Sequence, residues 1–221
     1  MRYLRALAAA FSYFSILPIP HAQAPPDDDA IALLPIVGLV IGGLAGYGAY
    51  GIALLTHSQL AAAIAAWVLS IALSGAIHVD GFLDCCDGLF AMAPPEKRLE
   101  IMRDPHHGTY AIAGMAMVSV LWLYALAQIP PSLMPATLAL TGCIARGLTL
   151  LVLRPSKRIP SPLVLLIGIV TIVPWLFGVF AKRRLGGVLN GDCYGAAIVV
   201  TEIALLMISA VSTSRGPGLF K

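Results

Sequence analysis

The chain has 221 residues, of which 59% are hydrophobic and only 11% charged, with a formal net charge of +3. Soluble domains carry about 25% charged residues, so this composition argues against a soluble enzyme, a disordered chain or a nucleic-acid-binding protein. It predicts one integral membrane domain over residues 1–221. We expect an all-α, polytopic helical bundle of about 5–7 transmembrane segments.

Residues 1–29 are predicted as an N-terminal interfacial segment. Arg2 and Arg5 precede an apolar stretch, and residues 22–24 (Ala-Gln-Ala) look like a signal-peptidase site. Pro25 would directly follow the cut, which disfavours cleavage. We therefore expect a retained helix near the membrane interface.

Apolar stretches further along the chain predict the membrane helices. In the first of them Gly38, Gly42 and Gly46 stand four residues apart and so share one helix face. Such a face favours close packing of another helix over a ligand groove. The predicted spans are residues 31–55, 60–77, 109–129, 134–153, 161–181 and 193–212.

Residues 78–104 hold six of the chain's eleven acidic residues. We predict an active-site loop over residues 78–108, because long polar loops tend to be functional. Basic residues near the span ends place this acidic loop on the cytoplasmic side. If every span crossed the membrane, the basic run 182–184 would lie on the outer side, against the rule. It lies on the cytoplasmic side if segment 161–181 does not cross the membrane, for instance by bending back at Pro174.

The chain's four cysteines contain no Cys-x-x-Cys pair, which disfavours a zinc site. Most of them lie in or beside apolar segments, so a disulfide framework is also disfavoured. We interpret Cys85, Cys86, Cys143 and Cys193 as small apolar fillers.

The most informative string runs from His78 to Gly88, His-Val-Asp-Gly-Phe-Leu-Asp-Cys-Cys-Asp-Gly. On a helix, Asp84 and Asp87 lie about 40° and 20° to either side of Asp80, so three carboxylates share one narrow face. Like charges at this spacing repel, and a divalent cation such as Mg²⁺ with substrate phosphates would compensate them. The alternative is a hydrated acidic helix cap. His78 points away from this face unless the helix begins after it, which leaves a catalytic and a hydrogen-bonding role open.

A second string, residues 102–110, leads into the next span. Asp104 precedes a proline and is held extended, which suits a loop ligand. Arg103 could pair with a phosphate or with a neighbouring acid. A transition-metal site at His106 and His107 is disfavoured, because adjacent side chains point to different sides.

A third string, residues 182–192, combines a basic run, glycines and Asp192 before an apolar span. It is a candidate phosphate-binding loop, although Lys182 and its neighbours could also be topology determinants. Asp192 could equally be an N-cap of the last span. Arg146 within span 134–153 is costly in lipid and should face the bundle interior, toward an acid or a phosphate. Together the strings outline a metal and phosphate site at the membrane surface.

Several motifs occur in an order that resembles the cobalamin synthase family, whose members are adenosylcobinamide-GDP ribazoletransferases. The most specific is the His-x-Asp-Gly-x-x-Asp-x-x-Asp-Gly string at residues 78–88. The chain departs from the family pattern between Arg154 and Lys182, where it is shorter. The other matching strings are Phe14–Pro20, Leu34–Gly38, Ile101–Asp104 with Gly108 and Thr109, Ala145–Gly147, and Gly191–Ala196.

The resemblance implies an Mg²⁺-dependent multi-pass enzyme of the cell inner membrane that joins adenosylcobinamide-GDP to α-ribazole or its 5′-phosphate and releases GMP. Its partners are these substrates and the lipid bilayer, with no nucleic acid. The site residues that the motifs imply fall into three groups. Catalytic candidates are His78, Asp80 and Asp84; substrate-binding candidates are Arg103, Asp104, Arg146, Lys182 and Gly191; metal candidates are Asp80, Asp84, Asp87 and Asp192.

Other functions stay open at this point. A membrane prenyltransferase would carry a second aspartate-rich string, and a CDP-alcohol phosphotransferase would place Ala-Arg much closer to its Asp-Gly than Ala145 and Arg146 lie. A cation transporter would pair acids at mid-membrane, where only Glu202 lies.

Overall fold

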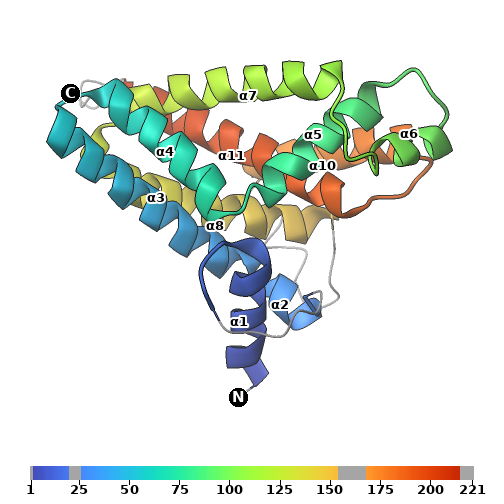
Figure 1. The fold of residues 1–221 in the computed structure, drawn as a ribbon, viewed down its shortest axis with the longest axis horizontal. Coiled ribbons are helices and arrows are strands. Elements are labelled where there is room, and N and C mark those ends of the chain that lie inside the picture. Colours follow the sequence, from blue (N-terminus) through green and yellow to red (C-terminus); the bar gives the residue numbers. More distant parts are fainter. Residues whose placement is uncertain (1, 20–25, 154–167, 215–221) are drawn as a thin grey trace. The chain divides into compact units, whose positions relative to one another are not determined.

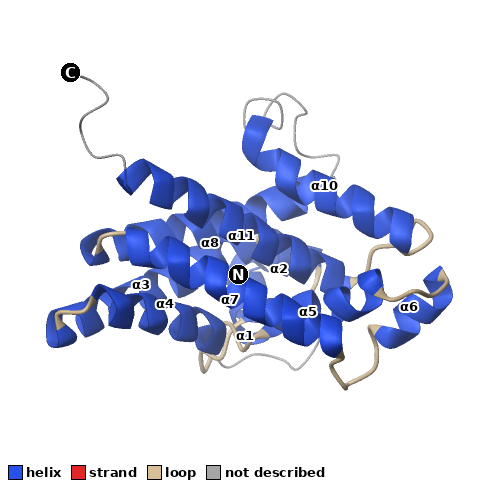
Figure 2. Cartoon of the chain, turned by 90° about the horizontal axis from the view of Figure 1, so that it is seen from above, coloured by secondary structure: helices blue, strands red, loops and turns tan. Residues whose placement is uncertain are grey.

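A computed structural model describes residues 2–19, 26–153 and 168–214. Helices joined by short connections make up these residues, and no strand occurs among them (Figure 2). The predicted all-α class is therefore confirmed for this part of the chain. The Ala-Gln-Ala string at 22–24 lies outside the described residues, as does the first part of the predicted span 161–181.

The helices follow the predicted spans closely, with additional short helices between them (Figure 1). In chain order they are α1 Arg2–Phe14, α2 Asp28–Ala32, α3 Leu34–Thr56, α4 Gln59–Leu73, α5 Ile77–Phe90, α6 Pro95–Ile101, α7 Thr109–Gln128, the 3₁₀ turn η1 Pro131–Leu133, α8 Met134–Leu153, α10 Gly168–Arg184 and α11 Gly191–Ser214.

Among the residues that the structure describes, four stretches are long and apolar enough to cross a membrane: α3, α7, η1 with α8, and α11. The number rises to five if α4 and α5 count as one broken span. α10 continues as a helix through Pro174, where a bend back was one of our expectations. These lengths and compositions are those of a multi-pass membrane protein, at the lower end of the expected number of spans.

The chain divides into two compact units. The first comprises residues 1–76, 121–147 and 205–221, and the second comprises residues 77–120 and 148–204. Each is described separately.

In the first unit α3 packs against α8 along the predicted glycine face. A Cβ atom on Gly38 would overlap the carbonyl oxygen of Gly142, and one on Gly42 would overlap that of Leu138. Gly46 approaches the backbone at Pro135 in the same way. The prediction that these glycines serve close helix packing is confirmed. α4 lies along α3 in both views (Figures 1 and 2).

α1 gives the predicted N-terminal segment its structure. It buries Ala6, Ala10 and Phe11 and leaves Tyr3 and Leu4 exposed. α2 begins at an N-cap, where Asp27 accepts a hydrogen bond from the Ala30 N–H. An ion pair between Arg2 and Asp29 joins the two helices.

In the second unit the predicted loop over residues 78–108 is wrong for most of its length, because α5 and α6 occupy 77–90 and 95–101. Two arginines stabilise the end of α5 by donating to its last carbonyl groups. Arg98 donates to Gly88 and Leu89, and Arg184 donates to Leu89 and Ala91. These bonds satisfy the carbonyls that a helix terminus leaves unpaired, and the positive charges suit the C-terminal end of the helix dipole.

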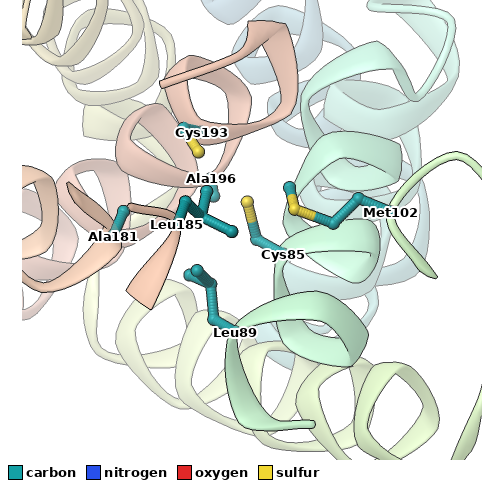
Figure 3. Packing of buried hydrophobic residues seen from close by; sticks show 7 residues of the cluster. All are labelled: Cys85, Leu89, Met102, Ala181, Leu185, Cys193 and Ala196. Atoms are coloured by element: carbon teal, nitrogen blue, oxygen red, sulfur yellow. The ribbon is translucent and has the colours of Figure 1, made fainter. Parts of the chain in front are cut away.

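An apolar core holds α5 against α10 and α11 in this unit (Figure 3). Side chains from all three helices converge there, together with Met102 after α6. Three cysteines are buried, Cys143 is partly buried, and all four are free, so the prediction that they form no disulfide is confirmed. The core residues are Cys85, Leu89, Met102, Ala181, Leu185, Cys193 and Ala196.

Candidate active site

α5 presents its three aspartates at increasing depth. The Asp80 side chain is 65% exposed and that of Asp84 is 16% exposed, whereas Asp87 is buried. All three lie within one continuous helix, as the spacing predicts. The face therefore leads from an open, hydrated end to a closed one.

His107 lies beside the open part of this face. Its Nε2 is 3.8 Å from Asp80 Oδ1, and its Nδ1 is 3.8 Å from Asp84 Oδ1. His106 turns elsewhere, toward Asp104, with its Nδ1 at 2.8 Å from Asp104 Oδ1. The two adjacent histidines thus point to different sides, as predicted, and only His107 reaches the acidic face.

Asp192, in the first turn of α11, joins the same cluster. Gly81 of α5 lies so close to it that a Cβ atom there would be 2.9 Å from Asp192 Cα. Asp84 experiences the negative charges of both Asp80 and Asp192. Asn190 donates to Asp192 Oδ2 at 2.7 Å and accepts from the Cys193 N–H at 3.2 Å. Asn190, and not Asp192, is therefore the N-cap of α11.

Asp87 uses its carboxylate inside the protein. Oδ2 accepts from the Gly108 N–H at 2.6 Å, and Oδ1 accepts from the Ala111 N–H at 3.0 Å. These donors lie just before α7 and in its first turn, so Asp87 caps α7 from a different helix.

The turn before α7 is ordered by Asp104. Its Oδ1 accepts from the His106 N–H at 2.9 Å. This bond and the contact with the His106 ring lower the pKa of Asp104, because they stabilise the charged carboxylate. Asp104 and Arg103 are both exposed in the segment between α6 and α7.

The three basic residues at the end of α10 lie in two different environments. Arg184 is occupied by the carbonyl oxygens of α5, while Lys182 and Arg183 are exposed. Burial and the neighbouring Arg184 lower the pKa of Arg98, the second arginine at this helix end. Among these cations, Lys182 and Arg183 remain accessible to a substrate phosphate.

Three other candidates lie in different surroundings. His78 is buried in the first turn of α5 against α11, where a Cβ atom on Gly195 would be 3.2 Å from its carbonyl oxygen. The helix begins at Ile77, before His78, so the condition under which His78 could face the acids is not met. Arg146 is buried in the other unit and donates to the Gly142 carbonyl. Gly191 is exposed, with open space around its Cβ position.

The oxygen donors of the acidic face determine which metal they suit. Within the described ranges, no three His, Cys, Asp or Glu side chains form a ready metal cage. Asp80 and Asp84 nevertheless have carboxylate oxygens with no closer partner in the described part of the chain than His107. Mg²⁺ is usually held by one or two carboxylates with substrate phosphates and water as its other ligands. The donor set therefore fits an open Mg²⁺ site that substrate completes.

Sequence reasoning missed His107, Asn190 and the two capping arginines as parts of this site. The signal for His107 was present, because it immediately precedes the glycine that opens α7. Asn190 also lies shortly before the predicted span 193–212, and asparagine at that place favours an N-cap. No sequence signal marks Arg184, because its carbonyl partners lie more than ninety residues away.

Comparison with known proteins identifies the family. The model of the family described as cobalamin-5-phosphate synthase matches residues 6–162 and 147–210 of this chain. The chain belongs to this family. The two matches overlap around residues 147–162, next to the segment where the sequence departs from the family pattern.

Relatives in this family share one name. The adenosylcobinamide-GDP ribazoletransferase of Deinococcus radiodurans is 33% identical over 91% of this chain and 84% of its own length. Proteins of the same name from Ralstonia nicotianae and Klebsiella pneumoniae are 28% and 29% identical over 95% and 92% of this chain. They are covered over 96% and 98% of their own lengths. No solved structure matches the chain.

Proposed function

We propose that this protein is an adenosylcobinamide-GDP ribazoletransferase that makes adenosylcobalamin or its 5′-phosphate. A ribose hydroxyl of α-ribazole or its 5′-phosphate attacks the phosphorus on the cobinamide side of the diphosphate. The bond from that phosphorus to the bridging oxygen breaks, and GMP leaves with the electron pair. The hydroxyl proton passes to a base of the enzyme. The family membership and the relatives' names support the reaction.

The observation that carries the mechanism is that Asp80 and Asp84 lie beside His107, while Asp192 lies against α5 at Gly81 in the same unit and its charge acts on Asp84. Bound Mg²⁺ would neutralise the diphosphate charge and stabilise the leaving phosphate. Asp84 and Asp192, which are half-buried, would hold the metal. Asp80 is more exposed than Asp84, and it is placed to accept the hydroxyl proton as well as to contribute an oxygen ligand.

Exposed cations of the same unit bind the substrate phosphates in this proposal. Arg103 lies just after the end of α6, and Lys182 lies in the last turn of α10. Gly191 leaves room for a bulky group because nothing lies within 4 Å of its Cβ position. Asp104 orders the turn that carries His107 and is itself open to substrate.

We further propose that the enzyme lies in the cell inner membrane with the acidic face on the cytoplasmic side. Arg2, Arg5, Lys97, Arg98 and Arg103 favour that side by the positive-inside rule. Arg98 contributes to this bias as a charge near a span end, although its guanidinium is buried.

The reaction is tested by incubating the detergent-solubilised full chain with adenosylcobinamide-GDP and measuring GMP. GMP should appear only when α-ribazole or its phosphate and Mg²⁺ are both present. Asp84→Asn should abolish release, whereas Glu100→Gln, the same chemical change at an exposed acid on α6, should not. Wild-type protein that is folded and releases no GMP would refute the proposed reaction. Release that persists in the presence of EDTA would refute the role of the metal.

A further inference from the structure

Asp87 is the third acid of the motif, yet its surroundings differ from those of the other two. Both of its oxygens accept hydrogen bonds from backbone N–H groups, at 2.6 Å from Gly108 and 3.0 Å from Ala111. It is only 8% exposed. Asp80 and Asp84 accept no such bonds in the part of the chain that the structure describes, and their closest charged neighbour there is His107.

The hydrogen bonds of Asp87 serve a need of α7. The first N–H groups of a helix have no partner within it, and residues 105–108 before α7 contain no Ser, Thr, Asp or Asn that could cap it. Asp87 supplies the acceptor from α5, and its negative charge also suits the N-terminal end of the helix dipole.

Gly108 is fitted to this contact. A Cβ atom there would lie 2.9 Å from Asp87 Oδ1, closer than real Cβ contacts come. A side chain at this position would push the Asp87 carboxylate away from the backbone N–H groups that it accepts from. Asp87 and Gly108 together form a clasp between α5 and the start of α7.

The clasp determines the position of His107. This residue immediately precedes Gly108, and its ring nitrogens lie 3.8 Å from Asp80 and from Asp84. We infer that Asp87 is a positioning residue that fastens the turn carrying His107 onto the acidic face, and that it is not a metal ligand. The catalytic consequence rests on the proposed function, whereas the clasp itself does not.

Hydrogen exchange tests the clasp without substrate or metal. In the full chain in detergent, Asp87→Asn should speed exchange of the amides between residues 105 and 112 by about tenfold, the effect of losing roughly one charged hydrogen bond. Glu100→Gln, the same chemical change at an exposed acid that pairs with Lys97 outside this segment, should leave exchange there unchanged. Gly108→Ala disrupts the same contact by changing its other partner and should reproduce the effect of Asp87→Asn. The second variant keeps the test valid if the first fails to fold. Unchanged exchange in both Asp87→Asn and Gly108→Ala would overturn the inference.

Metal binding separates positioning from ligation. With Mn²⁺ alone as the probe, followed by electron paramagnetic resonance, Asp84→Asn should weaken binding by about tenfold or more. Asp87→Asn should bind Mn²⁺ more tightly than Asp84→Asn does, because both Asp87 oxygens are taken by backbone N–H groups and supply no metal ligand. In the GMP assay Asp87→Asn should lower kcat while the KM for adenosylcobinamide-GDP stays near its wild-type value. Loss of Mn²⁺ by Asp87→Asn equal to that of Asp84→Asn would overturn the inference. If the wild type releases no GMP, the proposed function fails while the exchange comparison still decides the role of Asp87.

Discussion

Two neighbouring glycines on α3 allow the packing of this fold to be measured directly. Gly42 faces α8, where a Cβ atom would overlap the Leu138 carbonyl oxygen and lie 3.0 Å from the Ala139 nitrogen. Gly43 is next in sequence, and a Cβ atom there would meet only the Ala139 Cβ at 3.7 Å, an ordinary contact. Replacing each by alanine changes the same chemistry in two different surroundings.

The expected magnitudes follow from two opposing effects. Alanine improves helix propensity over glycine by about 1 kcal/mol, and this gain is common to both variants. Overpacking costs about 1–3 kcal/mol. Gly42→Ala should incur the upper part of that range, because the atoms it meets are backbone atoms that cannot rotate away. Gly42→Ala should therefore unfold with a free energy about 2–3 kcal/mol below that of Gly43→Ala.

Thermal unfolding of the detergent-solubilised chain provides the assay. For a chain of this length, 1 kcal/mol corresponds to roughly 2–4 °C in Tm, so the variants should differ by several degrees. Gly43→Ala should melt at or above the wild-type temperature. Equal melting temperatures for the two variants would refute close backbone packing of α3 on α8 as the reason for the glycine stripe.

Two further predictions concern the second unit. Arg98→Ala should lower the free energy of unfolding by about 2 kcal/mol or more, because it removes two buried hydrogen bonds and a part-buried one, all from a charged donor. Lys97→Ala, which removes an exposed ion pair on the same helix, should leave Tm unchanged and is the control. Asp104→Asn should melt below the wild type near neutral pH. Because folding lowers the pKa of Asp104, the stability it adds is present above its ordinary value of 3.8 and is lost as the pH falls through the lowered pKa. The difference in Tm should therefore close on acidification, and a difference that persists in acid would contradict this origin.

Hydrophobicity was sufficient to place the long helices. The predicted spans 109–129 and 134–153 differ from α7 and α8 by at most one residue at either end. The glycine stripe was equally predictable, since a four-residue spacing on an apolar helix leaves packing as its simplest use. Both features depend only on residues within one helix or on one of its faces, so local sequence contains the necessary information.

The segment 78–108 shows where such reasoning fails. Its charges, prolines and glycines are typical of a loop. A helix was assumed for residues 78–88 only to show that the three aspartates would share one face. The end of α5 is satisfied by side chains from other helices. The carbonyl groups at the end of α5 are paired by Arg98 and by Arg184, the latter 95 residues from Leu89. Tertiary hydrogen bonds of this kind override local propensity, and no local window of sequence contains both Leu89 and Arg184.

The roles within the acidic face were hidden for a related reason. Helical spacing puts Asp80, Asp84 and Asp87 on one side, and it treats them as equivalent. Burial and partners make them different, because Asp87 lies where α7 begins and finds two N–H donors there, while Asp80 and Asp84 lie beside His107. An aspartate whose oxygens are both occupied by backbone donors has less capacity to bind a metal than one whose oxygens are open. A motif of three acids on one helix face can thus combine two ligands with one structural clasp, and the partner that distinguishes them is the glycine after His107.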